Sequence, residues 1–281
     1  MTPAANPEVL RPGPAIKICG LTRLDDLLLA RDLGAWAAGF VFAPSPRRLT
    51  PAAARGLVEG LAAATQGSPG IAGVAASGAP VSGEPGAAAG PAPPLIAGVF
   101  GDVPAGEIAR VVAEVGLGAV QLHSADGPGG DAVRAALAKN GRPVTIIQAV
   151  PVDPRETDAA ALRHAVAMAR RQADIVLLDT QVGDRFGGTG RALPWSLAGE
   201  AGVGEVLVAG GIGPENVEAA LRESKAWGID VSSGVERSPG VKDARLLRQL
   251  FARAAAARQT GTAGAPAAMM HTDRSQRGPE S

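Results

Sequence analysis

Cysteine and histidine are scarce in this sequence of 281 residues, which contains one cysteine, Cys19, and three histidines. A single cysteine cannot form an intramolecular disulfide, and the histidines are too few and too scattered for a Cys/His zinc cluster. Residues 1–14 contain proline and an acidic residue, where a signal peptide has a basic start and a long apolar run. We therefore expect a protein of the reducing cytoplasm.

Excess charge of one sign and long apolar segments are also lacking. The 27 Lys and Arg residues balance the 27 Asp and Glu residues, so no overall field attracts nucleic acid or an anionic membrane. No stretch approaches the roughly 18 apolar residues of a membrane helix. These absences favour a small-molecule partner, and an anionic ligand would have to be held by local groups.

What the sequence does contain is a regular alternation of short apolar runs with segments of helical periodicity. Continuous apolar strands indicate a parallel sheet covered by helices, and eight strand–helix units are the number that closes a (β/α)8 TIM barrel. We predict a single barrel of the α/β class over residues 15–258. The expected strands are residues 15–19, 38–42, 95–100, 119–122, 144–150, 175–179, 205–209 and 228–231. The expected helices are residues 24–33, 51–63, 105–115, 131–139, 158–171, 195–201, 215–223 and 244–258.

An open doubly wound sheet is the alternative arrangement. A dinucleotide-binding sheet would carry Gly-x-Gly-x-x-Gly directly after its first strand, whereas here Cys19 is followed by Gly20, Leu21, Thr22 and Arg23. The closed barrel is therefore favoured.

Three segments lack the alternation. Residues 65–94 are dominated by Gly, Ala, Pro and Ser, and residues 1–14 and 259–281 lie outside the strand–helix units. We expect all three to be flexible. The 65–94 insertion falls between the second helix and the third strand, at the barrel face opposite the usual active site, so we expect it to leave the chemistry untouched.

Two groups suited to proton transfer are expected at the carboxyl ends of strands. Side chains alternate along a strand, so Cys19 shares its inward face with Lys17, and Asp179 also points inward at the end of the sixth strand. A thiol and a carboxylate then converge on one mouth, where one group could remove a proton while the other donates one. The alternative for Cys19 is a small buried hydrophobe without a chemical role.

An unperturbed thiol has a pKa of about 8.5, and Lys17 could lower the pKa of the Cys19 thiol below this value. Asp230 complicates this expectation, because in a closed barrel the eighth strand lies beside the first and Asp230 also faces inward. An ion pair between Lys17 and Asp230 is the alternative role for both residues.

Glycine-rich turns follow the last three strands, and their backbone N–H groups could cradle a phosphate. Barrels commonly bind phosphate with the loops after strands seven and eight. Ordinary tight turns also use glycine, but turns at these positions favour a phosphorylated ligand. The residues assigned to substrate binding in these turns are Gly188, Gly190, Gly210, Gly211, Ser232, Ser233 and Gly234.

Two arginines, Arg47 and Arg48, follow a proline-rich turn after the second strand. A guanidinium group suits a carboxylate clamp because it donates through two parallel N–H groups; the alternative is a solvated basic loop. His123, at the end of the fourth strand, could line the same mouth as a substrate-binding residue or could be structural.

Taken in order, these motifs resemble the phosphoribosylanthranilate isomerase family from about residue 16 to residue 251. The motifs are KICGLT (17–22), GFVF (39–42) followed by Ser45-Pro46-Arg47, VQLH (120–123), LLD (177–179), GGTG (187–190), GGI (210–212) and DVSSGVE (230–236).

The resemblance implies an Amadori rearrangement in tryptophan biosynthesis, which needs no cofactor and no metal. Its substrate would be N-(5-phospho-β-D-ribosyl)anthranilate and its product 1-(2-carboxyphenylamino)-1-deoxy-D-ribulose 5-phosphate. By motif, Asp179 matches the general acid that protonates the ribose ring oxygen, and Cys19 matches the general base that removes the proton from the second carbon. Arg47 matches the arginine that holds the anthranilate carboxylate, with Arg48 as the other candidate because the preceding turn is a residue shorter than in some members.

Two other functions stay open. A related barrel isomerase of another aminoaldose phosphate, such as the histidine-pathway ribonucleotide, typically has aspartates at both catalytic strand ends, and Cys19 argues against it. A non-catalytic phosphosugar-binding barrel would bind its ligand without turnover. No apolar surface stripe indicates association, so we expect a monomer rather than a homodimer.

Overall fold

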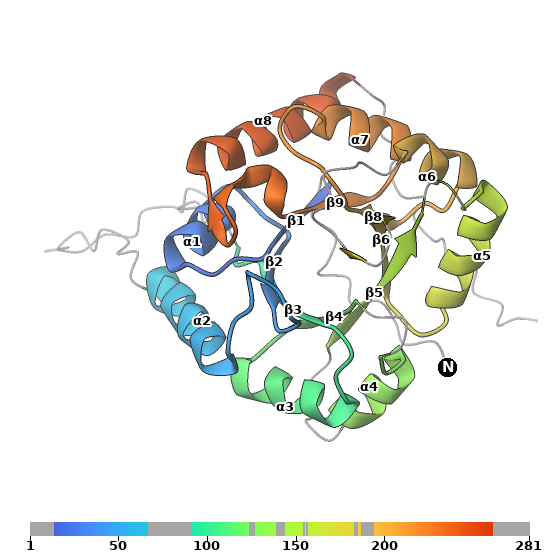
Figure 1. Ribbon diagram of the computed structural model, residues 1–281. Coiled ribbons are helices and arrows are strands. Elements are labelled where there is room, and N and C mark those ends of the chain that lie inside the picture. The colour runs from blue at the N-terminus through green and yellow to red at the C-terminus, as the bar shows by residue number, and fades with distance from the viewer. Residues whose placement is uncertain are drawn as a thin grey trace, which may run out of the picture.

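The computed structural model describes residues 14–66, 92–123, 127–138, 144–153, 155, 157–182, 185–186 and 194–260. Within these ranges eight parallel strands form a closed ring that is surrounded by helices (Figure 1). The ring closes because β1 pairs with both β2 and β9, and β5 pairs with β6. The predicted (β/α)8 barrel is thereby confirmed.

The elements follow one another as strand and helix along the chain. The barrel strands are β1 (Ala15–Cys19), β2 (Ala37–Val41), β3 (Leu95–Phe100), β4 (Ala119–Leu122), β5 (Thr145–Val152), β6 (Ile175–Val182), β8 (Val206–Val208) and β9 (Gly228–Val231). The helices are α1 (Leu24–Asp32), α2 (Pro51–Gln66), α3 (Ala105–Val115), α4 (Gly130–Leu137), α5 (Ala159–Ala169), α6 (Trp195–Ala201), α7 (Val217–Ser224) and α8 (Ala244–Thr260). None of these helices is long and apolar enough to span a lipid bilayer.

Short elements decorate the carboxyl ends of the last strands. The strand β7 (Arg185–Phe186) pairs antiparallel with the end of β6. After β9 come a short 3-10 helix, η3 (Ser233–Val235), and a hairpin of β10 (Glu236–Ser238) and β11 (Val241–Lys242). This hairpin leads directly into α8, so the chain returns over the barrel mouth before it closes the ring of helices.

Small inward side chains fill the amino-terminal end of the barrel. Five alanines on five different strands belong to the inner cluster, which leaves room for Trp36 and Trp227. The two indole rings meet edge to face with centroids 5.0 Å apart, a favoured arrangement for aromatic pairs. The inner cluster at this end of the barrel is therefore apolar.

The helices cover the sheet with apolar stripes of helical period. In α3 the buried residues Ile108, Val111, Val112 and Val115 recur three and four residues apart, which places them on one face. Gly116 ends the helix in the left-handed conformation, with φ of +78°, as expected for a glycine that terminates a helix.

Two helices extend into segments that were predicted to be flexible. The 65–94 insertion is predicted to begin at Thr65, but α2 continues through Gln66. The preceding alanines are strong helix formers, and the Thr65 hydroxyl donates to the Leu61 carbonyl oxygen at 2.9 Å. Likewise α8 includes residues 259 and 260 of the predicted tail. Residues 1–13, 67–91 and 261–281 lie outside the described residues, and with them the rest of the predicted flexible segments.

The sixth strand is also longer than predicted. The sequence predicts residues 175–179, whereas β6 continues to Val182 because its last residues pair with β7. The other strands and helices begin and end within two residues of the predicted positions. The carboxyl ends of the strands, with the loops that follow them, form what is called the barrel mouth below.

Candidate active site

Cys19 lies at the end of β1, with 9% of its surface exposed, in a small cluster with Val41 of β2 and Val99 of β3. Its neighbours Ile16 and Ile18 belong to the core between sheet and helices. The predicted alternation along β1 therefore holds, and the only thiol of the chain faces the barrel interior at the mouth.

Lys17 forms an ion pair with Asp230 inside the barrel. The strand register pairs these residues across β1 and β9, and Lys17 Nζ donates to Asp230 Oδ1 at 2.8 Å with the lysine side chain fully buried. The ion pair that was one of two alternatives for Lys17 is thus present. Burial lowers the pKa of Lys17, but the net shift is upward, with the charge of Asp230 as the largest raising cause, so Lys17 is a fixed ammonium group.

Lys17 was expected to lower the pKa of the Cys19 thiol, but the pKa of this thiol is raised. Burial raises this pKa, and it outweighs the opposing effect of Lys17, while Asp230 raises it further. The net result is a thiol pKa above the ordinary value. In the ligand-free protein Cys19 is therefore a protonated thiol at neutral pH.

A glycine on the neighbouring strand leaves space for the thiol. Gly39 pairs with Cys19 in the β1–β2 register. A Cβ atom built on Gly39 would lie 3.0 Å from Cys19 Sγ and 3.1 Å from Lys17 Nζ. Any larger residue would push the sulfur and the ammonium group from their positions.

Asp179 and His123 lie together on the other side of the barrel interior. Asp179 Oδ2 of β6 is 3.5 Å from His123 Nε2 at the end of β4. Burial and the nearby Asp230 raise the pKa of Asp179 to about 6, and burial lowers the pKa of His123. Near neutral pH the imidazole is neutral, and a fraction of the Asp179 carboxyl groups carries a proton.

The Lys17–Asp230 pair links the two proton-transfer groups electrostatically. Lys17 and Asp230 each act on the pKa of Cys19 and on that of Asp179. The thiol and the carboxyl group predicted to share a mouth therefore do face one interior, with a buried ion pair acting on both.

Gln121 is a polar residue of this interior that sequence reasoning did not single out. It is buried on β4, its Nε2 lies 3.4 Å from His123 Nδ1, and its Oε1 has no hydrogen-bond partner within the described part of the chain. Strand alternation carries the signal that could have found it, because Gln121 sits two residues before His123 on the same face.

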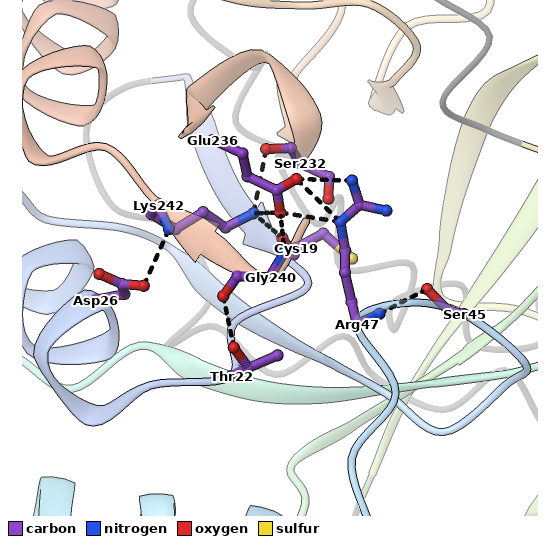
Figure 2. Close-up of polar contacts among 9 residues, drawn as sticks. All are labelled: Cys19, Thr22, Asp26, Ser45, Arg47, Ser232, Glu236, Gly240 and Lys242. Atoms are coloured by element: carbon purple, nitrogen blue, oxygen red, sulfur yellow. Dashed lines mark hydrogen bonds and ion pairs between the residues drawn. The ribbon is translucent and has the colours of Figure 1, made fainter. Parts of the chain in front are cut away.

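Arg47 and Arg48 occupy different environments. Arg47 reaches the hairpin after β9, where its guanidinium donates to both carboxylate oxygens of Glu236 (Figure 2). Arg48 is exposed, and its backbone forms a bridge to Val41. Of the two, only Arg47 projects into the group of residues around Cys19.

Lys242 connects the hairpin to β1 and was not anticipated from the sequence. Its ammonium group donates to the backbone oxygens of Cys19 at 2.6 Å and Ser232 at 3.1 Å and to Glu236 at 2.9 Å. Neither Glu236 nor Lys242 lies on a barrel strand, so the alternation that located the inward residues gave no signal for them.

The loops after β8 and β9 pack against each other. Gly210 and Gly211 have φ values of +93° and +64°, which glycine adopts without strain. Gly234 approaches so closely that a Cβ atom there would overlap the carbonyl oxygen of Ile212. Asn216 fixes the first loop by accepting from Gly213 N at 2.8 Å and donating to Gly211 O at 2.9 Å. Ser232 and Ser233 lie at the start of the second loop, whereas Gly188 and Gly190 lie outside the described residues.

Metal ligands do not gather in the part of the chain that the structure describes. It holds no group of three or more His, Cys, Asp or Glu side chains arranged to bind an ion. The described site holds one thiol, one imidazole, three carboxyl groups and three cationic side chains: Cys19, His123, Asp179, Asp230, Glu236, Lys17, Arg47 and Lys242.

Comparison with known proteins gives a consistent result. The family model described as N-(5'phosphoribosyl)anthranilate (PRA) isomerase matches residues 81–253. The N-(5'-phosphoribosyl)anthranilate isomerase of Paracoccus denitrificans (strain Pd 1222) is 38% identical over 248 residues, which cover 86% of this chain and 97% of that protein.

Solved structures match over the same extent. The phosphoribosyl anthranilate isomerase of Thermus thermophilus has a TM-score of 0.62 and 35% identity, covering 86% of this chain and 98% of that one. A phosphoribosyl anthranilate isomerase in complex with reduced 1-(o-carboxyphenylamino)-1-deoxyribulose 5-phosphate has a TM-score of 0.59 and 27% identity, with the same coverage.

Proposed function

This chain belongs to the N-(5'-phosphoribosyl)anthranilate isomerase family, and on that premise we propose that it rearranges N-(5-phospho-β-D-ribosyl)anthranilate to 1-(2-carboxyphenylamino)-1-deoxy-D-ribulose 5-phosphate. The reaction is an Amadori isomerisation in tryptophan biosynthesis. The observation that supports it most is that a buried thiol, Cys19, and a carboxyl group of raised pKa, Asp179, face one barrel interior.

Asp179 is the proposed general acid. Its proton passes to the ribose ring oxygen, the bond from that oxygen to the first carbon breaks, and the nitrogen lone pair forms the C=N bond of an iminium ion. A carboxyl pKa of about 6 supports this role, because part of the enzyme carries the proton near neutral pH while the group remains acidic enough to give it up.

Cys19 is the proposed general base. It removes the proton from the second carbon, the electrons of that C–H bond form the C=C bond, and the C=N electrons return to nitrogen to give an enolamine. In the free protein the thiol is protonated, so in the complex it first gives its proton to solvent. The proton taken from the second carbon then regenerates the thiol, and Asp179 regains its proton from solvent. The positive charge of the iminium ion favours the thiolate beside it, whereas Lys17, with its raised pKa, is held as a cation and is unsuited to accept a proton.

The sequence of steps conserves electrons without a cofactor. The enolamine tautomerises to the ketone by losing the proton of the second-carbon hydroxyl group and gaining one at the first carbon. One proton enters at the ring oxygen and one leaves the second carbon, so no oxidant or reductant is consumed.

The substrate carries two anionic groups, and we assign each to a part of the mouth. The guanidinium of Arg47 is the proposed partner of the anthranilate carboxylate, supported by its position beside the hairpin rather than in solvent. The phosphate is assigned to the packed loops after β8 and β9. The proposed phosphate residues are Gly210, Gly211, Ser232, Ser233 and Gly234, together with Gly188 and Gly190 beyond the described ranges. His123, which lies beside Asp179, keeps its proposed role as a substrate-binding residue.

We also propose that the protein is a cytoplasmic monomer. Within the described surface, Met168 is the one large apolar side chain counted as exposed, with 46% of its area accessible. A single exposed methionine is far less apolar area than a stable subunit interface covers. A free thiol at the site suits a reducing compartment.

Substrate turnover tests the proposed function. The full chain is mixed with freshly prepared phosphoribosylanthranilate, and the loss of substrate fluorescence is followed. We expect turnover of this substrate and none of the histidine-pathway aminoaldose ribonucleotide. Turnover of the histidine-pathway compound alone would indicate the related isomerase, and binding of phosphoribosylanthranilate without turnover would indicate a non-catalytic binding protein.

A further inference from the structure

Glu236 is the most heavily bonded carboxylate near the mouth, and none of the proton-transfer steps uses it. It begins β10, the first strand of the hairpin after β9, and only 4% of its side chain is exposed. Its oxygens accept from Arg47, from Lys242 Nζ at 2.9 Å and from the backbone N–H of Gly240 at 3.2 Å (Figure 2). A buried carboxylate needs hydrogen-bond partners of this kind. The role of Glu236 therefore depends on the residues that it binds.

Glu236 grips Arg47 along one edge of the guanidinium group. Arg47 Nε lies 2.9 Å from Oε1 and 3.2 Å from Oε2, and Arg47 Nη2 lies 2.7 Å from Oε2. These contacts use Nε–H and one hydrogen of Nη2. The adjacent edge, formed by Nη1 and the other hydrogen of Nη2, presents two parallel N–H groups that suit a second carboxylate.

The stem of Arg47 is fixed as well. A Cβ atom on Gly20 would collide with Arg47 Cδ, so the arginine chain lies directly across the Gly20 backbone. Gly20 has a φ of +72°, so a side chain there would be strained as well as blocked. Arg47 therefore crosses the loop that immediately follows Cys19.

Lys242 anchors the carboxylate to the strand that carries the thiol. Its Nζ donates to Glu236 and to the backbone oxygens of Cys19 and Ser232. Three acceptors around one nitrogen match the three N–H groups of an ammonium ion. The Lys242 backbone N–H donates to Asp26 Oδ2 at 3.0 Å, which ties the hairpin to α1.

The charges of this cluster leave it attractive to an anion. Burial raises the pKa of Glu236, but hydrogen bonds from Arg47 and Lys242 hold it below its usual value, and the hydrogen bond that Arg47 donates to Glu236 raises the pKa of Arg47. Two cations then face one carboxylate. Asp26 binds the backbone N–H of Lys242 and not Arg47, so the guanidinium of Arg47 is the group that offers its charge to an incoming carboxylate.

We propose that Glu236 is a positioning residue, which holds one edge of the Arg47 guanidinium so that the adjacent edge receives the anthranilate carboxylate beside Cys19. This inference rests on the proposed function. Lys242 completes the device by fixing Glu236 to the carbonyl oxygen of Cys19, so that the clamp and the base keep a constant separation.

Binding of two product analogues tests the inference. The first is reduced 1-(o-carboxyphenylamino)-1-deoxyribulose 5-phosphate, and the second is the same compound without the ring carboxyl group. We expect Glu236→Ala to weaken binding of the first by about 10- to 100-fold and to change binding of the second by less than about twofold. Glu218→Ala, an exposed glutamate of α7, is the matched control and is expected to change neither.

A double substitution separates positioning from general structure. If Glu236 acts through Arg47, adding Glu236→Ala to Arg47→Ala costs no further affinity for the carboxylated analogue, because the residue it orients is already gone. In turnover, KM rises in each single variant while kcat falls much less. Glu236→Gln keeps the size of the side chain and supplies the same selectivity ratio if the alanine variant does not fold.

The outcomes distinguish this inference from the proposed function. If the wild-type protein binds both analogues and Glu236→Ala weakens the two equally, or if its effect adds in full to that of Arg47→Ala, Glu236 only supports the fold and the inference is wrong. A wild-type protein that binds neither analogue overturns the proposed function and the inference with it.

Discussion

Lys17 Nζ lies 2.8 Å from Asp230 Oδ1 inside the barrel, where the lysine side chain has no exposed surface and the aspartate only 10%. The pair stands one layer below Cys19 and acts on the pKa of both Cys19 and Asp179. A buried pair of this kind gives little net stability compared with apolar residues, but either charge left alone is costly. The removal of either charge of this central ion pair is therefore expected to destabilise the folded protein.

Removing one partner of this pair is expected to destabilise the fold. Lys17→Met should lower the free energy of unfolding by about 3–5 kcal/mol, measured by urea denaturation at neutral pH. Arg55→Ala breaks the exposed pair with Glu59 on α2 and should cost less than about 1 kcal/mol. Equal losses in the two variants would mean that the Lys17–Asp230 pair is not effectively buried.

Asp179 is expected to make the protein less stable as its carboxyl group ionises. Its pKa is raised from 3.8 in the unfolded chain to about 6 in the folded protein, so the folded state holds the proton more tightly. The stability this gives is complete below about pH 4 and is lost as pH rises through about 6. Asp179→Asn should therefore be more stable than wild type by up to about 3 kcal/mol at pH 7, with the difference vanishing near pH 3. A difference that does not depend on pH would contradict the raised pKa.

Cys19 is expected to be alkylated only at a higher pH than an ordinary thiol. Burial raises its pKa despite Lys17, and the chain has no other cysteine, so iodoacetamide reports on this thiol alone. The rate in the folded protein should rise at a higher pH than in the urea-unfolded protein, which serves as the control. Asp230→Asn should move the folded curve to lower pH, because Asp230 raises the pKa of Cys19. A folded curve below the unfolded one would indicate a preformed thiolate.

Gly39 is expected to matter for turnover more than for folding. Its added Cβ in Gly39→Ala would meet Cys19 Sγ and Lys17 Nζ, and displacing a catalytic group by a fraction of an ångström should lower kcat by about 10- to 100-fold. Overpacking should cost about 1–3 kcal/mol of stability. Gly56→Ala on α2 meets nothing within 4 Å, so it should leave kcat unchanged and raise stability by about 0.4–1 kcal/mol. Unchanged kcat in Gly39→Ala would mean that the thiol position is not critical.

The residues of the barrel interior could be predicted because their positions follow from strand alternation. Lys17, Cys19, Asp179 and Asp230 were all expected to face inward, and the register of β1 with β9 brings Lys17 and Asp230 together. The sequence could not say which of two effects on the thiol pKa is larger. That balance depends on how completely Cys19 is buried, which the neighbouring strands decide.

Residues in the loops of the mouth could not be found in this way. Glu236, Lys242 and Asn216 lie on a hairpin and a turn, where side chains follow no repeating pattern. The contact between Lys242 and Cys19 joins residues 223 positions apart, and no local pattern in either segment predicts it. The choice of Arg47 over Arg48 depends on its ion pair with Glu236, which the sequence does not reveal.

The most direct test of the account is the turnover of phosphoribosylanthranilate by Cys19→Ser and Asp179→Asn, with Asp25→Asn, an exposed aspartate of α1, as the control. We expect kcat to fall by at least about 100-fold in each of the first two variants, while binding of the product analogue and the activity of Asp25→Asn stay near wild type. Folded Cys19→Ser and Asp179→Asn proteins that retain wild-type kcat would contradict the assignment of Cys19 as base and Asp179 as acid.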